Sequence, residues 1–425
     1  MVGLLVCNKG DPCPSCHSAM ALVSTEPSQT IALPDANLRE DINDALSEMR
    51  VSLEQNSPEE VLANAEKDLK ALMNTRLDIA ITGASGTGKS SLVNAFRNIT
   101  ESEEGAAETG VKQTTMIPEE YPHPHFPGIT LWDLPGIGTP GFQPKEYLQK
   151  INFSRYDFFI IVASERFTMN DAMLASEIQK TKKSFYFVRT KVDQAMDAER
   201  RKPNFSEKQT LEVIRKYCLF NLIKGGVVNP RIFLVSSWHL NMYDFPFLQM
   251  TLANDLNDLK RFLLFMAMSP FSRENLLEKK AAMEAVIWKK ALLSCAIGVI
   301  PLPGLSLSVD IGLLVTTLKD ICKAFGLDED SLCNLANRVG KPVDVLRSAV
   351  KKTPLANQIN PQFVRSLITP SPLVGSAMVL EMISDFIPGM GSLGAYSFST
   401  SFYMLKRFLE DAMKDAENVL AKVVE

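Results

Sequence analysis

Residues 78–96 constrain the fold of this chain more than any other segment. Their sequence, DIAITGASGTGKSSLVNAF, has an apolar run, then the pattern G-x-x-x-x-G-K-S, then an amphipathic stretch. This order predicts a strand, a glycine-rich loop and a helix, in which successive backbone N–H groups can point at phosphate oxygens. The alternative is a glycine-rich turn without a ligand. The flanking strand and helix favour a phosphate site made by Gly83, Ala84, Ser85, Gly86, Thr87, Gly88, Lys89, Ser90 and Ser91.

Two side chains of this loop have distinct expected roles. The ammonium of Lys89 would lie at the β- and γ-phosphates, and the hydroxyl of Ser90 would be a ligand of Mg²⁺. The helix that starts near Lys89 adds its positive N-terminal end to the same site. The loop therefore predicts a bound nucleotide with Mg²⁺ as cofactor.

A second motif, WDLPGIG, follows another apolar run and contains Asp133 and Gly136 in a D-x-x-G arrangement. The carboxylate of Asp133 can hold Mg²⁺ through water, and the N–H of Gly136 can contact the γ-phosphate. We therefore expect both residues at the phosphate end of the site.

A third motif, RTKVD, contains Thr190, Lys191 and Asp193 and points to the base. A carboxylate there can accept hydrogen bonds from N1–H and the exocyclic N2–H₂ of guanine. Adenine offers the opposite pattern and would leave the carboxylate unpaired. In LVSS, a backbone N–H at Ser236 or Ser237 could meet guanine O6. The three motifs together predict GTP and GDP as ligands.

The same region has the pattern of an α/β fold. Apolar runs at 77–82, 129–135, 156–164, 184–191 and 231–237 have little polar alternation and are separated by helical stretches. Such strands are buried on both faces, which predicts a doubly wound, mostly parallel sheet with helices on both faces. Long helical patterns follow to the C-terminus. We expect a flexible leader (1–35), N-terminal helices (36–75), a GTPase domain (76–240) and a C-terminal helical domain (241–425).

Residues 101–128 lie between the first two motifs and are typical of a switch segment that closes over the γ-phosphate and Mg²⁺. Thr115, or else Thr114, is the candidate metal ligand, and a solvated loop is the alternative. His123 and His125 could be read as metal ligands, but histidines at this spacing in a loop are more often structural.

The residue that follows the D-x-x-G motif does not favour rapid hydrolysis of GTP. Many small GTPases place a glutamine there to orient the attacking water, and this chain has Ile137. Slow intrinsic turnover is expected unless a residue arrives from a second subunit or a helper protein. Glu165 and Arg166 are candidates from within the chain, or simply solvated loop charges.

The net charge, the cysteines and two long uncharged stretches limit the class of protein. A net charge of −4 argues against a nucleic-acid partner. Seven scattered cysteines favour a reducing compartment. The sequence CPSCH, with Cys13, Cys16 and His17, is the pattern for haem attachment, and these residues with Cys7 could also hold zinc. A mobile tail with exposed thiols is the simpler interpretation. Residues 291–309 and 386–405 are long and uncharged, but Pro and Gly interrupt them, which favours buried helices over membrane spans.

From residue 38 to the C-terminus the chain resembles the immunity-related GTPases, the interferon-inducible p47 GTPases. The resemblance lies in GASGTGKSSLVNA, GAAETGV, LWDLPGIGTPGF, YDFFIIVASERF, FYFVRTKVD, NPRIFLVSS and YDFPFL. The lysine in GTGKSS places the chain with the GKS type. The position that often carries a catalytic glutamate in this family is matched here by Gln113.

The resemblance implies a Ras-like GTPase domain combined with a helical domain built from the N- and C-terminal segments. It further implies a homodimer or GTP-dependent oligomer, with dimers facing each other across their nucleotides. Family members attach to intracellular membranes, which implies a cytoplasmic protein at the surface of a vacuole, the ER or the Golgi, in defence against vacuolar pathogens. Because Val2 stands where myristoylation requires glycine, attachment would use the C-terminal helices or acylated cysteines. A monomeric switch or a slow-turnover scaffold with a separate effector are the alternatives.

Overall fold

The computed structural model describes residues 56–110, 117–137, 142–165, 167–270, 272–298, 305–368 and 391–424. The chain divides into two compact units, Met1–Asn43 and Asp44–Glu425, and all described residues belong to the second. The leader and its cysteines, Gln113 and Thr115 lie outside the described residues.

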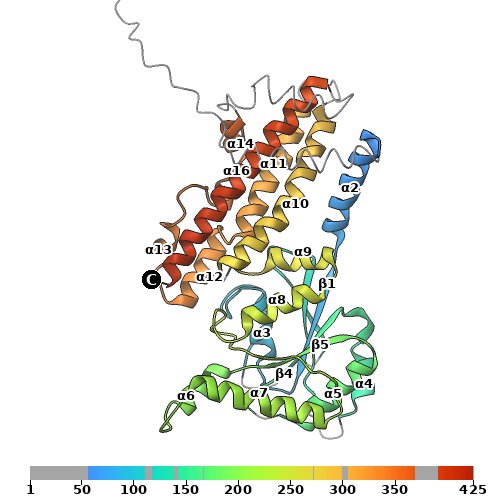
Figure 1. Cartoon of the computed structure of the whole chain (residues 1–425), viewed down its shortest axis with the longest axis vertical. Coiled ribbons are helices and arrows are strands. Elements are labelled where there is room, and N and C mark those ends of the chain that lie inside the picture. The colour runs from blue at the N-terminus through green and yellow to red at the C-terminus, as the bar shows by residue number, and fades with distance from the viewer. Residues whose placement is uncertain are drawn as a thin grey trace, which may run out of the picture. The chain divides into compact units, whose positions relative to one another are not determined.

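A six-stranded sheet with the order β2-β3-β1-β4-β5-β6 forms the centre of the nucleotide-binding part (Figure 1). Its strands are β1 (Leu77–Gly83), β2 (Glu119–Pro122), β3 (Ile129–Asp133), β4 (Phe158–Ala163), β5 (Ser184–Arg189) and β6 (Ile232–Leu234). All neighbouring pairs are parallel except β2 with β3. The predicted mostly parallel sheet is confirmed. The short edge strand β2 was not predicted, because it lies inside the segment interpreted as a switch loop.

Helices cover both faces of this sheet: α3 (Lys89–Phe96), α4 (Pro144–Lys150), α5 (Met169–Lys180), α6 (Val192–Glu199), α7 (Glu207–Lys224) and α8 (Phe245–Asp255). Along β1, Ile79 and Ile81 join the apolar cluster on one face while Ala80 joins the cluster on the other. This alternation is what a strand buried on both faces requires. Helix α8 packs on the sheet through Phe245 and Leu248. Helix α8 therefore packs on the sheet, although the expected domain boundary between residues 240 and 241 assigns it to the helical domain.

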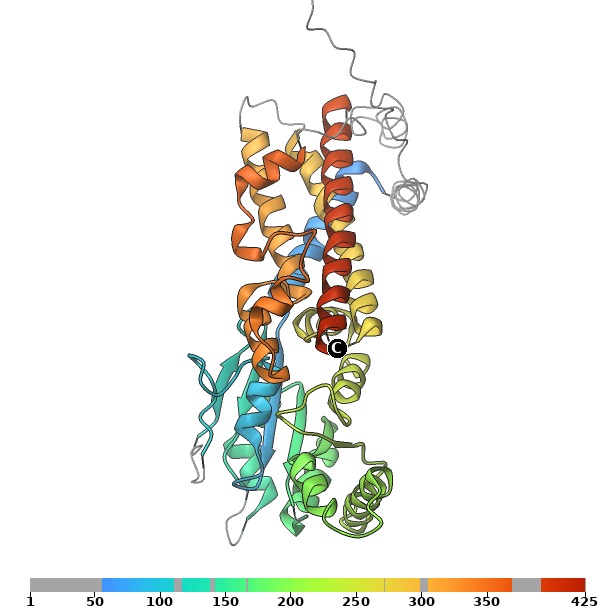
Figure 2. The ribbon, with the colours of Figure 1, turned by 90° about the vertical axis from the view of Figure 1, so that its left-hand side faces the viewer.

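The remaining described helices form the helical part. They are α2 (Pro58–Asn74), α9 (Asp258–Ala267), α10 (Arg273–Gly298), α11 (Leu305–Ala324), α12 (Glu329–Val339), α13 (Val343–Arg347), α14 (Pro361–Ile368) and α16 (Gly391–Val424). Two short 3-10 turns, Phe153–Arg155 and Ala356–Gln358, complete the assigned elements. Helices α10, α11 and α16 pack side by side, and α2 packs against α10 (Figures 1 and 2). Helix α2 begins with a capping box between Ser57 and Glu60, as its sequence predicts.

The two long uncharged stretches lie partly in α10, α11 and α16, while residues 299–304 and 386–390 are outside the described ranges. Across the ranges given above, no helix has the length and apolar character needed to cross a membrane.

Candidate nucleotide-binding site

The loop between β1 and α3 has the backbone of a phosphate cradle. At Gly83, φ is +148° and an added Cβ would lie 2.0 Å from the carbonyl oxygen of Val162, so only glycine fits beside β4. Gly88 precedes α3 in the left-handed region, with φ +87°. Ser85 and Gly86 at the tip are exposed. The exposed tip of the loop can thus meet a ligand at the N-terminus of α3.

Lys89 and Ser90 lie in the first turn of α3, as predicted. The buried ammonium of Lys89 donates to the carbonyl oxygen of Ala84 at 3.2 Å. Burial lowers the pKa of Lys89, and the Asp133 carboxylate opposes that shift. A cation held this way inside the loop is poised for the phosphates that the loop would cradle.

Ser90 and Asp133 meet although they come from different elements. The hydroxyl of Ser90 donates to Oδ2 of Asp133 at 2.5 Å, which joins α3 to the end of β3. A hydroxyl and a carboxylate side by side are the hard oxygen donors that Mg²⁺ prefers. These two residues therefore fit the predicted metal.

Gly136 lies directly against the phosphate loop. A Cβ at this position would be 3.2 Å from the backbone nitrogen of Ser85. The next residue, Ile137, is fully buried, and its N–H donates to the Gly83 carbonyl oxygen at 3.2 Å. Asn170 of α5 donates to the Ile137 carbonyl oxygen at 2.8 Å. Ile137 is thus locked into the core and cannot orient a water molecule.

The guanine motif is tied to the phosphate loop. The hydroxyl of Thr190 donates to the carbonyl oxygen of Thr87 at 2.5 Å. The ammonium of Lys191 donates to the carbonyl oxygen of Gly86 at 2.9 Å. Asp193 lies in the first turn of α6, and its Oδ1 is buried without a hydrogen-bond partner in the described part of the chain. A buried acceptor left open is what recognition of guanine N–H groups requires.

The two serines after β6 differ in their surroundings. Ser236 is fully buried, and its hydroxyl oxygen accepts from the N–H groups of Trp238 and His239, both at 3.2 Å. This bonding shapes the loop. Ser237 is half-buried and lines a cavity together with Ser91 and Asn94 of α3.

Sequence reasoning missed two side chains that hold the site together. The hydroxyl of Tyr147 in α4 is 2.7 Å from that of Thr82 and donates to the Pro135 carbonyl oxygen at 3.0 Å. Asn94 exchanges two hydrogen bonds with the backbone of Ala107, at 2.7 and 2.9 Å. Tyr147 lies outside the motifs, and Asn94, although it stands in GASGTGKSSLVNA, has a partner that only the fold reveals.

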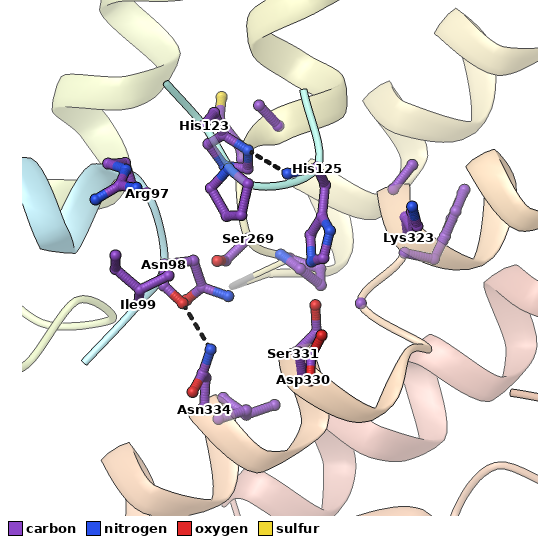
Figure 3. Close-up of a pocket in the computed structure, with 18 of the residues that line it drawn as sticks. Arg97, Asn98, Ile99, His123, His125, Ser269, Lys323, Asp330, Ser331 and Asn334 are labelled. Atoms are coloured by element: carbon purple, nitrogen blue, oxygen red, sulfur yellow. Dashed lines mark hydrogen bonds between the residues drawn. The ribbon is translucent and has the colours of Figure 1, made fainter. Parts of the chain in front are cut away.

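Helix α12 contacts both ends of the segment between α3 and β3 (Figure 3). Asn334 donates to the Asn98 carbonyl oxygen and to Glu103, both at 3.1 Å. At the other end, Nε2 of His125 is 3.5 Å from Oδ1 of Asp328, the N-cap of α12. A cavity of about 150 Å³ lies between these contacts.

The two histidines beside β2 have structural surroundings. His123 is buried, and its Nδ1 accepts the N–H of His125 at 3.3 Å. Among the residues that the structure describes, no group of three or more His, Cys, Asp or Glu side chains could hold a metal ion. The thiols of Cys218, Cys322 and Cys333 are free.

Comparison with known proteins identifies a family, related sequences and a solved structure that this chain resembles. A family model described as "Interferon-inducible GTPase (IIGP)" matches residues 42–423. Interferon-inducible GTPase 5 of Rattus norvegicus is 41% identical over 384 residues, which cover 89% of this chain and 82% of the relative. Interferon-gamma-inducible GTPase 10 of Mus musculus is 35% identical over 385 residues, covering 90% and 89%. A solved structure of Toc33 from Arabidopsis thaliana is 16% identical with a TM-score of 0.31, over 43% of this chain and 81% of that one.

Proposed function

The chain belongs to the interferon-inducible GTPase family, and we propose that this GTPase assembles with itself on intracellular membranes when GTP is bound. Binding and hydrolysis of GTP are the activity of the family. The assembly would serve interferon-induced defence against vacuolar pathogens.

The residues of the site have separate parts in this activity. Lys89 and the loop N–H groups would bind the β- and γ-phosphates. Thr190 and Lys191 are bonded to the loop and would join it to the base site, where Asp193 would accept hydrogen bonds from guanine. Ser90 and Asp133 would hold Mg²⁺, with Thr115 proposed as a further ligand. Bound there, the metal would neutralise charge that develops on the phosphates.

The buried side chain of Ile137 is the observation that carries the assembly proposal. Because Ile137 is fixed by Gly83 and Asn170 in the core, the position after D-x-x-G supplies no group that can orient water. A second copy facing the nucleotide could supply one, and Gln113 is the proposed candidate. Hydrolysis would then depend on how often two copies meet.

The test is GTP turnover per molecule over a wide range of protein concentrations, with light scattering recorded in parallel. Assembly predicts turnover per molecule that rises with concentration, together with scattering that requires GTP. A constant, slow turnover without scattering would instead support a monomeric switch or a scaffold.

Lys89→Ala is the matched control for both signals. It removes the ammonium from the phosphate loop, so the variant should neither turn over GTP nor scatter light. A variant that kept GTP binding would contradict the assignment of the phosphate site.

A further inference from the structure

The C-terminal half of α7 exposes apolar side chains that the nucleotide site does not use. Phe220 is 65% exposed, Ile223 is 56% exposed, and Val228 in the following turn is 65% exposed. On the opposite side of the helix, Cys218 and Leu222 are buried against the sheet. The exposed side chains therefore take no part in the apolar core of the protein.

Lysines are frequent in the two chain segments around these apolar side chains. The segments 177–183 and 216–229 contain one carboxylate, Glu177, and five lysines: Lys180, Lys182, Lys183, Lys216 and Lys224. The whole chain has a net charge of −4, so this excess of positive charge is local and opposite to the average.

The two segments form one surface. The side-chain amide of Gln179 donates to the Val228 carbonyl oxygen at 2.8 Å and accepts its N–H at 2.9 Å. A Cβ at Gly225 would lie 2.4 Å from that of Ala172. The end of α7 thus lies along α5, as Figure 1 shows. We call the surface made by 177–183 and 216–229 the α5–α7 face.

The lysines of this face differ in what they already bind. Lys180 pairs with Glu177 and Lys216 with Glu212, at 3.0 and 2.7 Å. The ammonium of Lys183 donates to the backbone carbonyl oxygens of Ser154 and Tyr156. Within the described ranges, Lys182 and Lys224 make no ion pair, and both are exposed. Two exposed cations of these segments are thus available to a ligand.

We infer that the α5–α7 face docks on an anionic membrane, with Phe220, Ile223 and Val228 at the level of the headgroups and Lys182 and Lys224 against lipid phosphates or carboxylates. Apolar insertion combined with basic side chains is the chemistry of peripheral attachment to acidic lipid. A second copy of the same face is disfavoured because like charges would meet. The inference rests on the proposed membrane association and names the surface for it.

The experiment is flotation of the full chain with a non-hydrolysable GTP analogue on two kinds of vesicle. One is pure phosphatidylcholine, and in the other about a third of the lipid is phosphatidylserine. The unchanged protein is expected to bind the anionic vesicles about tenfold more than the neutral ones, and less in high salt.

Two double variants of the face test the apolar and basic parts separately. Phe220→Ser with Ile223→Ser, and Lys182→Glu with Lys224→Glu, should each lower binding about tenfold. Matched controls carry Met73→Ser on α2 and Lys145→Glu on α4, which are also exposed. These controls should bind as the unchanged protein does. All variants change exposed residues, and circular dichroism checks their fold.

The possible results of these flotation experiments test the α5–α7 face and the proposed membrane association separately. If the unchanged protein floats and the face variants float equally well, the α5–α7 face is wrong while membrane association stands. If the unchanged protein floats with neither vesicle, both the face and the proposed membrane association are contradicted. If binding is lost equally in face and control variants, the face has no special role and the inference fails.

Discussion

At the scale of single residues, Asp193 is the side chain that we propose reads the base. Its Oδ1 is buried and has no hydrogen-bond partner in the described part of the chain. The residues just before it are fixed, since Thr190 and Lys191 are bonded to the phosphate loop. Guanine offers this carboxylate N–H donors, whereas adenine would leave it unpaired.

Asp193→Asn should exchange the preferred base. An amide at this position can donate to the carbonyl oxygen of xanthine, so we expect GTP affinity to fall about a hundredfold or more while xanthosine triphosphate binds better. Titration with fluorescent nucleotides measures both affinities. Asp197→Asn in the same helix changes an exposed carboxylate paired with Arg200 and should leave base preference unaltered. Unchanged guanine selectivity in the Asp193 variant would show that another residue reads the base.

His123 should make the free energy of unfolding depend on pH. Burial, aided by nearby His125, Arg97 and Lys279, lowers the pKa of His123 from 6.5 to about 3. Between these values the unfolded chain binds a proton that the folded chain does not. The free energy of unfolding should therefore fall by about 1.4 kcal/mol per pH unit below pH 6.5.

Urea titrations at several pH values between neutral and mildly acidic measure this slope. His123→Gln should reduce the slope, while His239→Gln, at an exposed site, should not. An identical slope in the His123 variant would place the acid sensitivity elsewhere.

At the scale of elements, α12 connects the helical part to the segment that contains the proposed switch. Asn334 bonds to residues just after α3, and Asp328 meets His125 just after β2. Burial alone would raise the pKa of Asp328, but hydrogen bonds from His125 and Ser331 outweigh it and lower that pKa overall. One helix thus holds both anchor points of residues 98–125, and the segment between them contains Gln113 and Thr115.

Asn334→Ala should loosen this anchor. It removes two hydrogen bonds from a buried amide and leaves the carbonyl oxygen of Asn98 with one partner fewer, so we expect a loss of about 1–3 kcal/mol in the free energy of unfolding. Asn337→Ala is the control one turn further, because Asn337 is exposed and should change stability by less than about 0.5 kcal/mol. Equal effects of the two substitutions, measured in urea, would mean that the Asn334 contacts do not stabilise the fold.

The sequence predicts the elements whose pattern is local and misses those fixed by distant contacts. Strands β1, β3, β4, β5 and β6 were found because each is a continuous apolar run buried on both faces. Strand β2 was missed because it is a short edge strand with alternating exposure. The contacts between Ser90 and Asp133 and between Thr190 and the phosphate loop agree with the motif order, because each motif follows a strand of the same sheet. The role of Tyr147 depends on α4 meeting β1, which no spacing reveals.

At the scale of the whole folded unit, the GTPase part and the helical part share one continuous core. Leu264 and Phe265 of α9 join the same apolar cluster as β1 and β3. Lys260 of α9 pairs with Asp157 at 2.5 Å. The fully buried Lys279 of α10 donates to the carbonyl oxygens of Met266 and Ala324, at 3.0 and 2.5 Å. With α12 attached as well, the helical part cannot separate without exposing buried groups of the GTPase part.

The two parts should therefore unfold together and respond together to nucleotide. Trp132 on β3 and Trp288 on α10 report on the two parts, each in a variant where the other tryptophans are phenylalanine. GDP at about a hundred times its dissociation constant should raise the free energy of unfolding by about 2.7 kcal/mol at both probes, because binding stabilises the unit as a whole. Adding Lys89→Ala should abolish the increase at both. If GDP shifted only the Trp132 transition, the helical part would unfold on its own, and α12 could not transmit the nucleotide state to it.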